Sequence, residues 1–468
     1  MTQYDVIVIG GGSPGEHFAA AVADGGLRVA LVERELLGGE CSFWACIPSK
    51  TLLRPGEVVA AALDVPGAKE AVTGQVDVKA ALAWRDFMVS SYDDEGGEKW
   101  AREAGIDVLR GDGRIAGPNT VAVGEQTYTT GHIVIATGSE AFIPPIPGLR
   151  ELDVWTNREA TGVKEIPDRL LILGGGPVGV EMAQAFRRLG AEVALVEGAD
   201  HLLPREPEAV GRALGVALAA DGVELHLGAH ATAASKDGDE YVLDFPDGKQ
   251  LRGDKLLVAT GRRPRVTGIG LETVGVEPNP HGLVTDERMN VADGVWAVGD
   301  VTGQWNLTHV GKYQGRVAAA NILGKPAAVD YSAVPRVVFT DPQVAAVGAA
   351  EGKYTATAHL SGVARTATYT REYATRPGFL TLVSDGEVLI GAYAIGPEAG
   401  EWLQQATVAI RCDISRSGVI FRHARKALAC RKITRVPLSV LLDVIQPFPT
   451  FSEAFLNGLR DLAKEVAK

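Results

Sequence analysis

Short apolar runs that end in glycine recur along the chain and predict buried parallel β-strands. Residues 4–10 and 28–33 are two such runs, with a glycine-rich turn and a helix-length stretch between them. Residues 170–174 and 192–197 repeat this arrangement. A parallel sheet is covered on both faces, so its strands are apolar almost throughout. The pattern therefore predicts two βαβ units.

The remaining apolar runs are of two kinds. Further strands that end in small residues are expected at 132–138, 255–261 and 295–300. From about residue 334, alternating runs instead predict antiparallel strands and then helices, and hence a separate α+β domain. The expected strands there are 336–339, 379–383 and 388–395, and the expected helices are 401–411, 436–445 and 452–467.

The first glycine-rich turn has the spacing of a dinucleotide cradle. Gly10, Gly12 and Gly15 follow the first strand as G-x-G-x-x-G, and Glu33 closes the next strand. Such glycines let the backbone approach a pyrophosphate, the helix N-terminus supplies free N–H groups, and the carboxylate binds a ribose hydroxyl. A plain tight turn is the alternative, but strand, helix and acid here are in register.

A second cradle follows the strand at 170–174. Its residues are Gly174, Gly176, Gly179 and Glu197. Two cradles in one chain indicate two dinucleotides. A carboxylate at the position of Glu197 binds a 2′-hydroxyl and repels a 2′-phosphate, which favours NAD(H) over NADP(H). His201 and Arg205 lie nearby in the sequence and weaken that preference.

Charge and composition narrow the classes of partner. The formal net charge is −12, which disfavours a nucleic acid partner. No apolar run approaches the ~20 residues that span a bilayer, and no basic-then-apolar segment precedes the first strand. We therefore expect a soluble, cytoplasmic protein with no membrane partner. Four cysteines are too few for a secreted disulfide framework in a chain of 468 residues.

Two of these cysteines, Cys41 and Cys46, are five residues apart. On a regular helix their Cα atoms would lie about 8–9 Å apart, beyond the ~4.4–6.8 Å that a disulfide tolerates. An oxidised pair therefore needs a distorted turn, with which Pro48 is consistent. Two buried free thiols or half of a metal site are the alternatives. No further Cys or His cluster completes a zinc-type ligand set, so we expect a redox-active pair and no metal.

The stretch around these cysteines also resembles a known family. Residues 38–50, Gly-Gly-Glu-Cys-Ser-Phe-Trp-Ala-Cys-Ile-Pro-Ser-Lys, resemble the G-G-x-C-x-x-x-x-C-x-P-[ST]-K signature of class I flavoprotein disulfide reductases. That family includes lipoamide dehydrogenase, glutathione reductase and mercuric reductase. The resemblance covers nearly the whole chain, since residues 136–138 and 259–264 look like the family's domain-closing turns and 298–300 like its flavin-ribityl site.

The resemblance implies an α/β fold with two Rossmann-like domains of the glutathione-reductase type and a C-terminal α+β dimerisation domain. FAD would bind residues 1–150, completed by 279–333, and NAD(P) would bind 151–278. The interface domain would be 334–468. Beyond the two cradles, the residues implied in cofactor binding are Gly113, Thr137, Gly138, Gly261, Asp300 and His309. A local hydrogen bond is the alternative role for His309.

The resemblance assigns roles around the cysteine pair. Cys46 would face the flavin as a charge-transfer thiolate, and Cys41 would exchange with the substrate. Lys50 matches a lysine beside the flavin N5, and Glu181 matches its carboxylate partner; plain surface charges are the alternative. Both thiols are expected where a helix N-terminus and a neighbouring cation lower a thiol pKa.

The C-terminal sequence departs from the family pattern. Members that reduce disulfides carry His-Pro-Thr-x-x-Glu, donated across a homodimer, and this chain has Phe448 in place of the histidine but keeps Glu453. Phenylalanine cannot supply the acid–base assistance, typically ~10²–10⁴-fold, that thiol exchange uses. We therefore expect a homodimer that passes electrons from NAD(P)H through flavin to Cys41 and Cys46. The final acceptor would be an unidentified disulfide, small thiol or other small molecule, with poor turnover of lipoamide.

Three other functions stay open. The flavin could reduce quinones, dyes or metal ions directly, or the chain could be a non-catalytic part of a larger complex. It also resembles 2-ketopropyl coenzyme M carboxylase, which has phenylalanine at the position of Phe448 but histidine at that of Glu453. Residues 411–435 add eight Arg or Lys against one Asp, with Cys412 and Cys430. This basic stretch is interpreted as a solvated insertion, an anionic-partner site or a second thiol relay.

Overall fold

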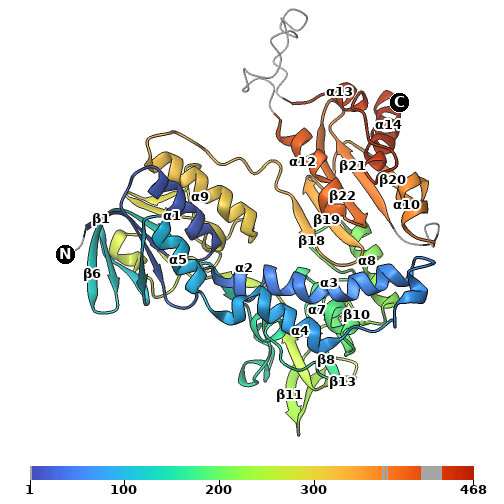
Figure 1. The fold of residues 1–468 in the computed structure, drawn as a ribbon, viewed down its shortest axis with the longest axis horizontal. Helices are drawn as coiled ribbons and strands as arrows, with labels where there is room; N and C mark the ends of the chain where they lie inside the picture. The colour runs from blue at the N-terminus through green and yellow to red at the C-terminus, as the bar shows by residue number, and fades with distance from the viewer. Residues whose placement is uncertain (1–2, 372–374, 376–377, 413–434) are drawn as a thin grey trace, which may run out of the picture.

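Three β-sheets position the site, and the computed structural model describes the chain over residues 3–371, 375, 378–412 and 435–468 (Figure 1). The first sheet has eight strands, and its central part is parallel. In spatial order the parallel strands are β17 (Val295–Ala297), β6 (Gln126–Ile135), β1 (Gln3–Ile9), β2 (Val29–Glu33) and β3 (Ile106–Arg110). The first sheet thus combines the N-terminal segment with a strand from beyond the second cradle.

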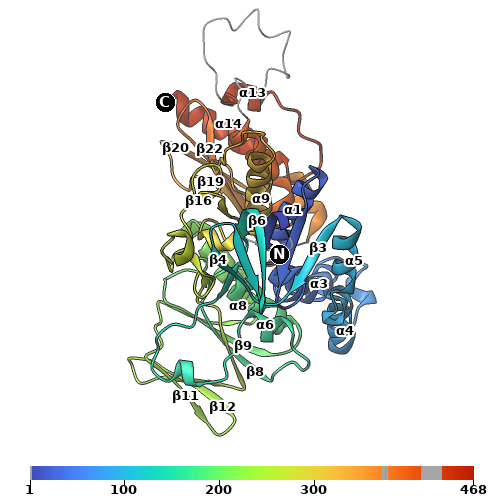
Figure 2. The same cartoon turned by 90° about the vertical axis from the view of Figure 1, so that its left-hand side faces the viewer.

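Both faces of this sheet are covered, which explains the continuous apolar run of its first strand. Val6 and Val8 pack toward α1 (Ser13–Asp24) and α9 (Thr308–Ile322), which lie side by side (Figures 1 and 2). Ile7 and Ile9 pack into the cluster on the other face. All four side chains are buried. The strands expected at 4–10 and 28–33 are confirmed to within one residue.

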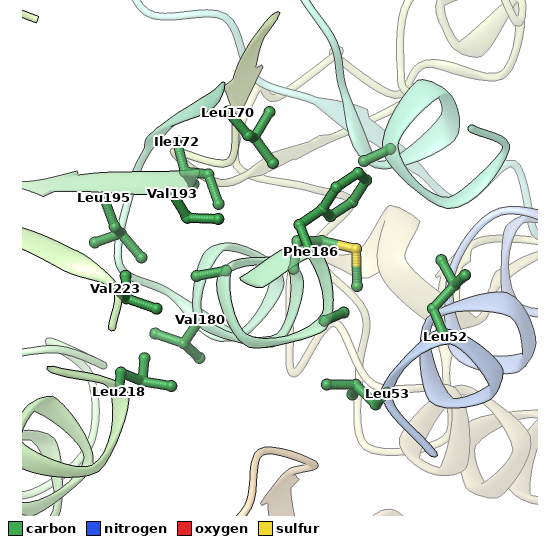
Figure 3. Close-up of a cluster of buried hydrophobic side chains, with 14 of the residues drawn as sticks. Leu52, Leu53, Leu170, Ile172, Val180, Phe186, Val193, Leu195, Leu218 and Val223 are labelled. Carbon is green, nitrogen blue, oxygen red and sulfur yellow. The ribbon is translucent and has the colours of Figure 1, made fainter. Parts of the chain in front are cut away.

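The second sheet is parallel and has four strands. In spatial order they are β10 (Glu224–Leu227), β9 (Glu192–Glu197), β8 (Arg169–Leu173) and β14 (Lys255–Val258). Helix α7 (Pro177–Arg188) packs on this sheet through Phe186, and Leu52 and Leu53 of α3 (Cys46–Leu63) join the same cluster (Figure 3). The helix that begins at Cys46 is therefore held against the unit that carries the second cradle.

The C-terminal sheet is antiparallel, as the alternating runs predict. In spatial order its strands are β18 (Arg336–Val338), β19 (Gln343–Gly348), β22 (Leu389–Gly396), β21 (Phe379–Ser384) and β20 (Tyr354–His359). Helices α12 (Gln404–Arg411), α13 (Leu438–Leu442) and α14 (Glu453–Ala467) share its apolar cluster. The fold class is thus the expected one. Most of the basic stretch, residues 413–434 with Cys430, lies outside the described residues.

Two short strands connect the first sheet to the second. β7 (Ser139–Ala141) precedes the second sheet and β15 (Arg262–Pro264) follows it, and the two pair antiparallel. The chain therefore leaves and re-enters the first unit along one ribbon. This ribbon lies beside the first cradle, because residues on both of its strands line the same cavity as that cradle.

Candidate active site

The first cradle has the backbone geometry that a pyrophosphate needs. Gly10 adopts φ +113°, and a Cβ there would collide with the carbonyl of Ala136. A Cβ on Gly15 would collide with the carbonyl oxygen of Gly10, whereas the space beside Gly12, where α1 begins, is open. The Glu33 carboxylate accepts hydrogen bonds from the backbone N–H of Gly11, at 2.8 Å, and of Glu35, at 2.7 Å. It is thus fixed at the end of β2.

A cavity of about 450 Å³ extends from this cradle to Cys41. Gly12, Glu33, Asp300 and Cys41 all line it, as do Gly113, Thr137 and Gly138. Burial raises the pKa of Asp300, and the hydroxyl of Ser139 donates to its carboxylate at 2.6 Å. An open phosphate cradle, a fixed carboxylate for a ribose and a buried hydrogen-bonding carboxylate along one cavity fit FAD.

The second cradle reproduces the first. Gly174 also has φ +113° and lies against the carbonyl of Ala259, as Gly10 lies against that of Ala136. Glu197 accepts from the backbone N–H of Gly175 at 2.6 Å and of Ala199 at 2.8 Å. Gly176 precedes α7, Gly179 packs on the carbonyl of Gly174, and Gly261 follows β14 with φ +130°. The chain therefore has two equivalent dinucleotide cradles.

The turn between the cysteines is distorted, as the disulfide geometry requires. Helix α2 (Gly39–Phe43) carries Cys41 and ends before Trp44. Ala45 has φ −136° and ψ −95°, and α3 begins at Cys46. Pro48 lies in the first turn of α3, where a backbone N–H has no partner within the helix, so it favours this new helix start.

The surroundings shift the pKa values of the two thiols in opposite directions. A hydrogen bond from Cys41 lowers the pKa of Cys46 to about 6, against burial and with help from Thr308 and Lys50. The Thr308 hydroxyl lies 3.4 Å from the Cys46 sulfur. The same bond to Cys46, with burial, raises the pKa of Cys41. The expectation of a lowered thiol pKa is thus confirmed for Cys46 and wrong for Cys41, because the partner thiolate keeps the proton on Cys41.

Lys50 and Glu181 meet beside the cysteine helix. The Lys50 ammonium lies 2.7 Å from Oε2 of Glu181, whose side chain is only 6% exposed. Oε1 of Glu181 accepts the backbone N–H of Phe339 at 2.9 Å, and the Lys50 ammonium lies 4.7 Å from the centre of the Phe339 ring. This ion pair joins α3, α7 and the end of β18, so it is a built contact and not a pair of surface charges.

Thr308 was missed by the sequence analysis, which named its neighbour His309. Thr308 opens α9 and lines the cavity. His309 is not among the residues that line the cavity. It donates instead to the carbonyl of Pro335 at 2.8 Å, which agrees with its alternative role in a local hydrogen bond. Thr308 and Cys46 are 262 residues apart, so their contact has no direct sign in the sequence. The only indication was that Thr308 is next to His309, the position that resembles a family residue near the flavin.

Phe448 and Glu453 lie in the C-terminal unit. Phe448 is 76% exposed, and Glu453 accepts the backbone N–H of Thr450 at 3.3 Å. The segment between α13 and α14 lies away from α3 in both views (Figures 1 and 2). Within one chain these residues and the cysteines are therefore not brought together.

A fold with two dinucleotide cradles and a coupled pair of thiols, one of which lines the cavity beside the first cradle, defines a flavin- and pyridine-nucleotide-dependent disulfide oxidoreductase. Residues 4–315 match the family described as pyridine nucleotide-disulphide oxidoreductase, and residues 334–424 match its dimerisation domain. The chain belongs to this family and is a flavoprotein enzyme that binds FAD and a pyridine nucleotide. The dimerisation domain indicates a homodimer.

Similar proteins carry several different activities. A dihydrolipoyl dehydrogenase of Thermus scotoductus is 35% identical over 100% of this chain and 99% of its own length. A mercuric reductase of Acidithiobacillus ferrooxidans is 36% identical over 87% of this chain and 77% of its own length. Among solved structures, the Cu(II) complex of the HOCl-induced flavoprotein disulfide reductase RclA from Escherichia coli has a TM-score of 0.81, with 27% identity and complete coverage of both chains.

Two further features are absent from the described residues: a metal-binding group and a membrane-spanning helix. Over the described ranges, no group of three or more His, Cys, Asp or Glu side chains is placed to hold a metal ion. No helix in the described part of the chain is long and apolar enough to cross a membrane.

Proposed function

We propose that this enzyme oxidises NADH and reduces a small acceptor through the Cys41–Cys46 pair. The observation that carries the proposal is the Cys46 sulfur, which has a lowered pKa and lies 3.4 Å from the hydroxyl of Thr308. Thr308 and Cys41 both line the cavity that fits FAD. When bound, FAD supplies two-electron transfer between a nicotinamide and a disulfide. Cys46 would hold the thiolate at rest, and Cys41 would attack the acceptor as a thiolate after it passes its hydrogen-bonded proton to Cys46.

The division of the chain between the cofactors is part of the proposal. Residues 1–150 with 279–333 would bind FAD, 151–278 would bind the nicotinamide dinucleotide, and 334–468 would form the dimer interface. The Lys50–Glu181 pair would position α3 against the nicotinamide unit, because it joins the two. A reducing compartment keeps such thiols active, so we place the enzyme in the cytoplasm.

NADH is the preferred reductant in this proposal. Both oxygens of Glu197 are fixed by backbone N–H groups, so the carboxylate stays at the strand end and would repel a 2′-phosphate. His201 is committed to the carbonyl of Leu202, at 2.8 Å. The ratio of kcat/KM for NADH to that for NADPH tests this preference, and a ratio below one contradicts it.

The acceptor class follows from the apolar residue at the C-terminus. Phe448 offers no proton to a departing thiol, which favours acceptors whose reduction releases no thiol, such as quinones, dyes or metal ions. The similarity to mercuric reductases and to a Cu(II) complex of RclA supports metal ions as acceptors within this group. Phe448 and Glu453 would approach Cys41 only from the partner subunit of the homodimer.

A second candidate is direct reduction of these acceptors by the flavin, which the exposed apolar Phe448 also favours. An anaerobic assay with NADH and a panel of lipoamide, quinone, dye and metal-ion acceptors separates the two. We expect Cys41→Ser to abolish reduction of the preferred acceptor, with Cys412→Ser at the end of α12 as the matched control. Full activity in Cys41→Ser would contradict reduction through the cysteine pair and support direct reduction of the acceptor by the flavin.

A further inference from the structure

The residue before Cys41 is a carboxylate held by three arginines. Glu40 accepts from Arg158 at 2.7 Å, and its carboxylate also lies 3.5 Å from Arg262 and 3.9 Å from Arg265. Asn157 donates to it at 2.9 Å. Burial alone would raise the pKa of Glu40, but Arg262, the Asn157 hydrogen bond and Arg158 reverse this and lower it. Glu40 is therefore an anion inside the cavity.

This cluster lies beside the first cradle. Gly38 and Gly12 form an isolated parallel bridge, and a Cβ on Gly39 would lie 2.8 Å from the Cα of Gly12. Glu40 follows directly, and Arg158, Arg262 and Arg265 line the same cavity as Gly12. A carboxylate so near the site of a diphosphate would repel it unless cations outweigh the carboxylate.

Arg265 differs from the other two arginines. Arg158 hydrogen-bonds Glu35 and Glu40, and Arg262 hydrogen-bonds Ser139 and Asn157. Within the described part of the chain, the guanidinium of Arg265 makes only long ion pairs, at 3.9 Å to Glu40 and 3.7 Å to Glu140.

Arg265 lacks a close anionic partner among the described residues around it. Its buried Nε has no hydrogen-bond partner among the described residues. Glu40 is already held by Arg158, and Glu140 by Arg263 at 2.6 Å. Burial, opposed by Glu40 and reinforced by the neighbouring Arg34 and Arg158, lowers the pKa of Arg265. A cation that burial disfavours and whose carboxylate neighbours are already paired is stabilised by an additional anionic ligand.

We propose that Arg265 binds the diphosphate of FAD opposite the N-terminus of α1, and that Glu40 acts as the positioning residue that holds Arg265 there. The cradle supplies backbone N–H groups on one side of the diphosphate, and Arg265 supplies a planar cationic fork on the other. This inference depends on FAD binding, which follows from the family, and not on the acceptor or on the route of the electrons.

The test measures FAD affinity of the full-length holoenzyme. The fraction of FAD released on dilution, followed by flavin fluorescence, gives the dissociation constant. Loss of one charge-assisted contact in Arg265→Gln is expected to raise it about 10- to 100-fold. The matched control is Arg28→Gln, an arginine of the same unit with a 57% exposed side chain outside the cavity lining, which should change it less than about 2-fold. Near-ultraviolet circular dichroism at saturating FAD checks that both variants are folded.

Competition identifies the part of FAD that Arg265 contacts. We expect ADP to compete with FAD through the same diphosphate, so its inhibition constant should weaken by a similar factor in Arg265→Gln. Adenosine has no phosphate, and its constant should not change. An FAD affinity within 2-fold of wild type, or equal weakening of ADP and adenosine, would overturn the assignment.

Glu40→Gln separates positioning from simple charge repulsion. If Glu40 only repels the diphosphate, its neutralisation tightens FAD binding. If Glu40 holds Arg265 in place, the variant binds FAD more weakly, and it adds little to the loss caused by Arg265→Gln. Tighter binding in Glu40→Gln would contradict the positioning role.

Discussion

The hydroxyl of Thr308 lies 3.4 Å from the sulfur of Cys46, although the two residues are 262 positions apart. Cys46 opens α3 and Thr308 opens α9, so two helix N-termini converge on one sulfur. Backbone N–H groups at a helix start favour an anion, and the hydroxyl adds a directed hydrogen bond. The pKa of Cys41 is raised by its bond to Cys46 and by burial, which outweigh the Thr308 hydroxyl, so Cys46 is the favoured thiolate of the reduced pair.

Removal of the Thr308 hydroxyl should raise the pKa of Cys46. A hydrogen bond to a charged group contributes about 1.5–3 kcal/mol, which corresponds to roughly 1–2 pKa units. We expect this rise in Thr308→Val and little change in Thr308→Ser, which keeps the donor. The pKa is read from the pH dependence of thiolate absorbance in the reduced enzyme, and equal values in all three proteins would contradict the contact.

The reactivity of reduced Cys46 should follow its lowered pKa. With a pKa of about 6, most of the sulfur is thiolate at pH 7, and the thiolate fraction falls as pH decreases through 6. Because the hydrogen bond from Cys41 is the largest cause, Cys41→Ala, which removes the donor, should shift the alkylation profile of Cys46 to higher pH. A profile centred near an ordinary thiol value in wild type would refute the assignment.

The Lys50–Glu181 pair should be structurally costly to break. Glu181→Ala leaves the N–H of Phe339 without its acceptor and the partly exposed Lys50 without its partner, which should cost about 1.5–3 kcal/mol of unfolding free energy. The control is Glu57→Ala, which removes an exposed partner of Arg54 on the same helix and should cost under about 1 kcal/mol. Denaturant unfolding measures both, and equal costs would show that the pair is only a surface contact.

Phe448→His should restore proton transfer to thiol exchange. We expect lipoamide turnover to rise about 10²-fold or more, with Phe448→Leu as the control that changes shape but adds no base. Turnover with a quinone should change little in either variant. Efficient lipoamide turnover by the wild type would contradict the view that Phe448 limits the acceptor range.

Local sequence was sufficient for the parts of the site that a single turn defines. The two cradles, Glu33 and Glu197 follow from spacing alone, and the distorted turn at residues 44–45 follows from the reach of a disulfide. The residue contacts of Thr308 and Arg265 could not be predicted in this way, because they depend on side chains that only the tertiary fold brings together. The expected strands were recovered best where both faces are buried, as in β1 and β9.

The sequence also did not predict that the pKa values of the two thiols shift in opposite directions. Cys41 lies in the first turn of α2 and Cys46 opens α3, so the pattern alone suggests two lowered pKa values. Their mutual hydrogen bond makes the two ionisations oppose each other, so only one sulfur can be the favoured anion. Such coupling depends on the distance between the side chains.

The most direct test of the account is thiol labelling of the purified holoenzyme before and after anaerobic addition of NADH, followed by mass spectrometry of each cysteine. We expect Cys41 and Cys46 to resist alkylation as isolated and both to become alkylated after NADH, while labelling of Cys412 stays constant. Identical labelling of Cys41 and Cys46 with and without NADH would contradict electron transfer to this pair.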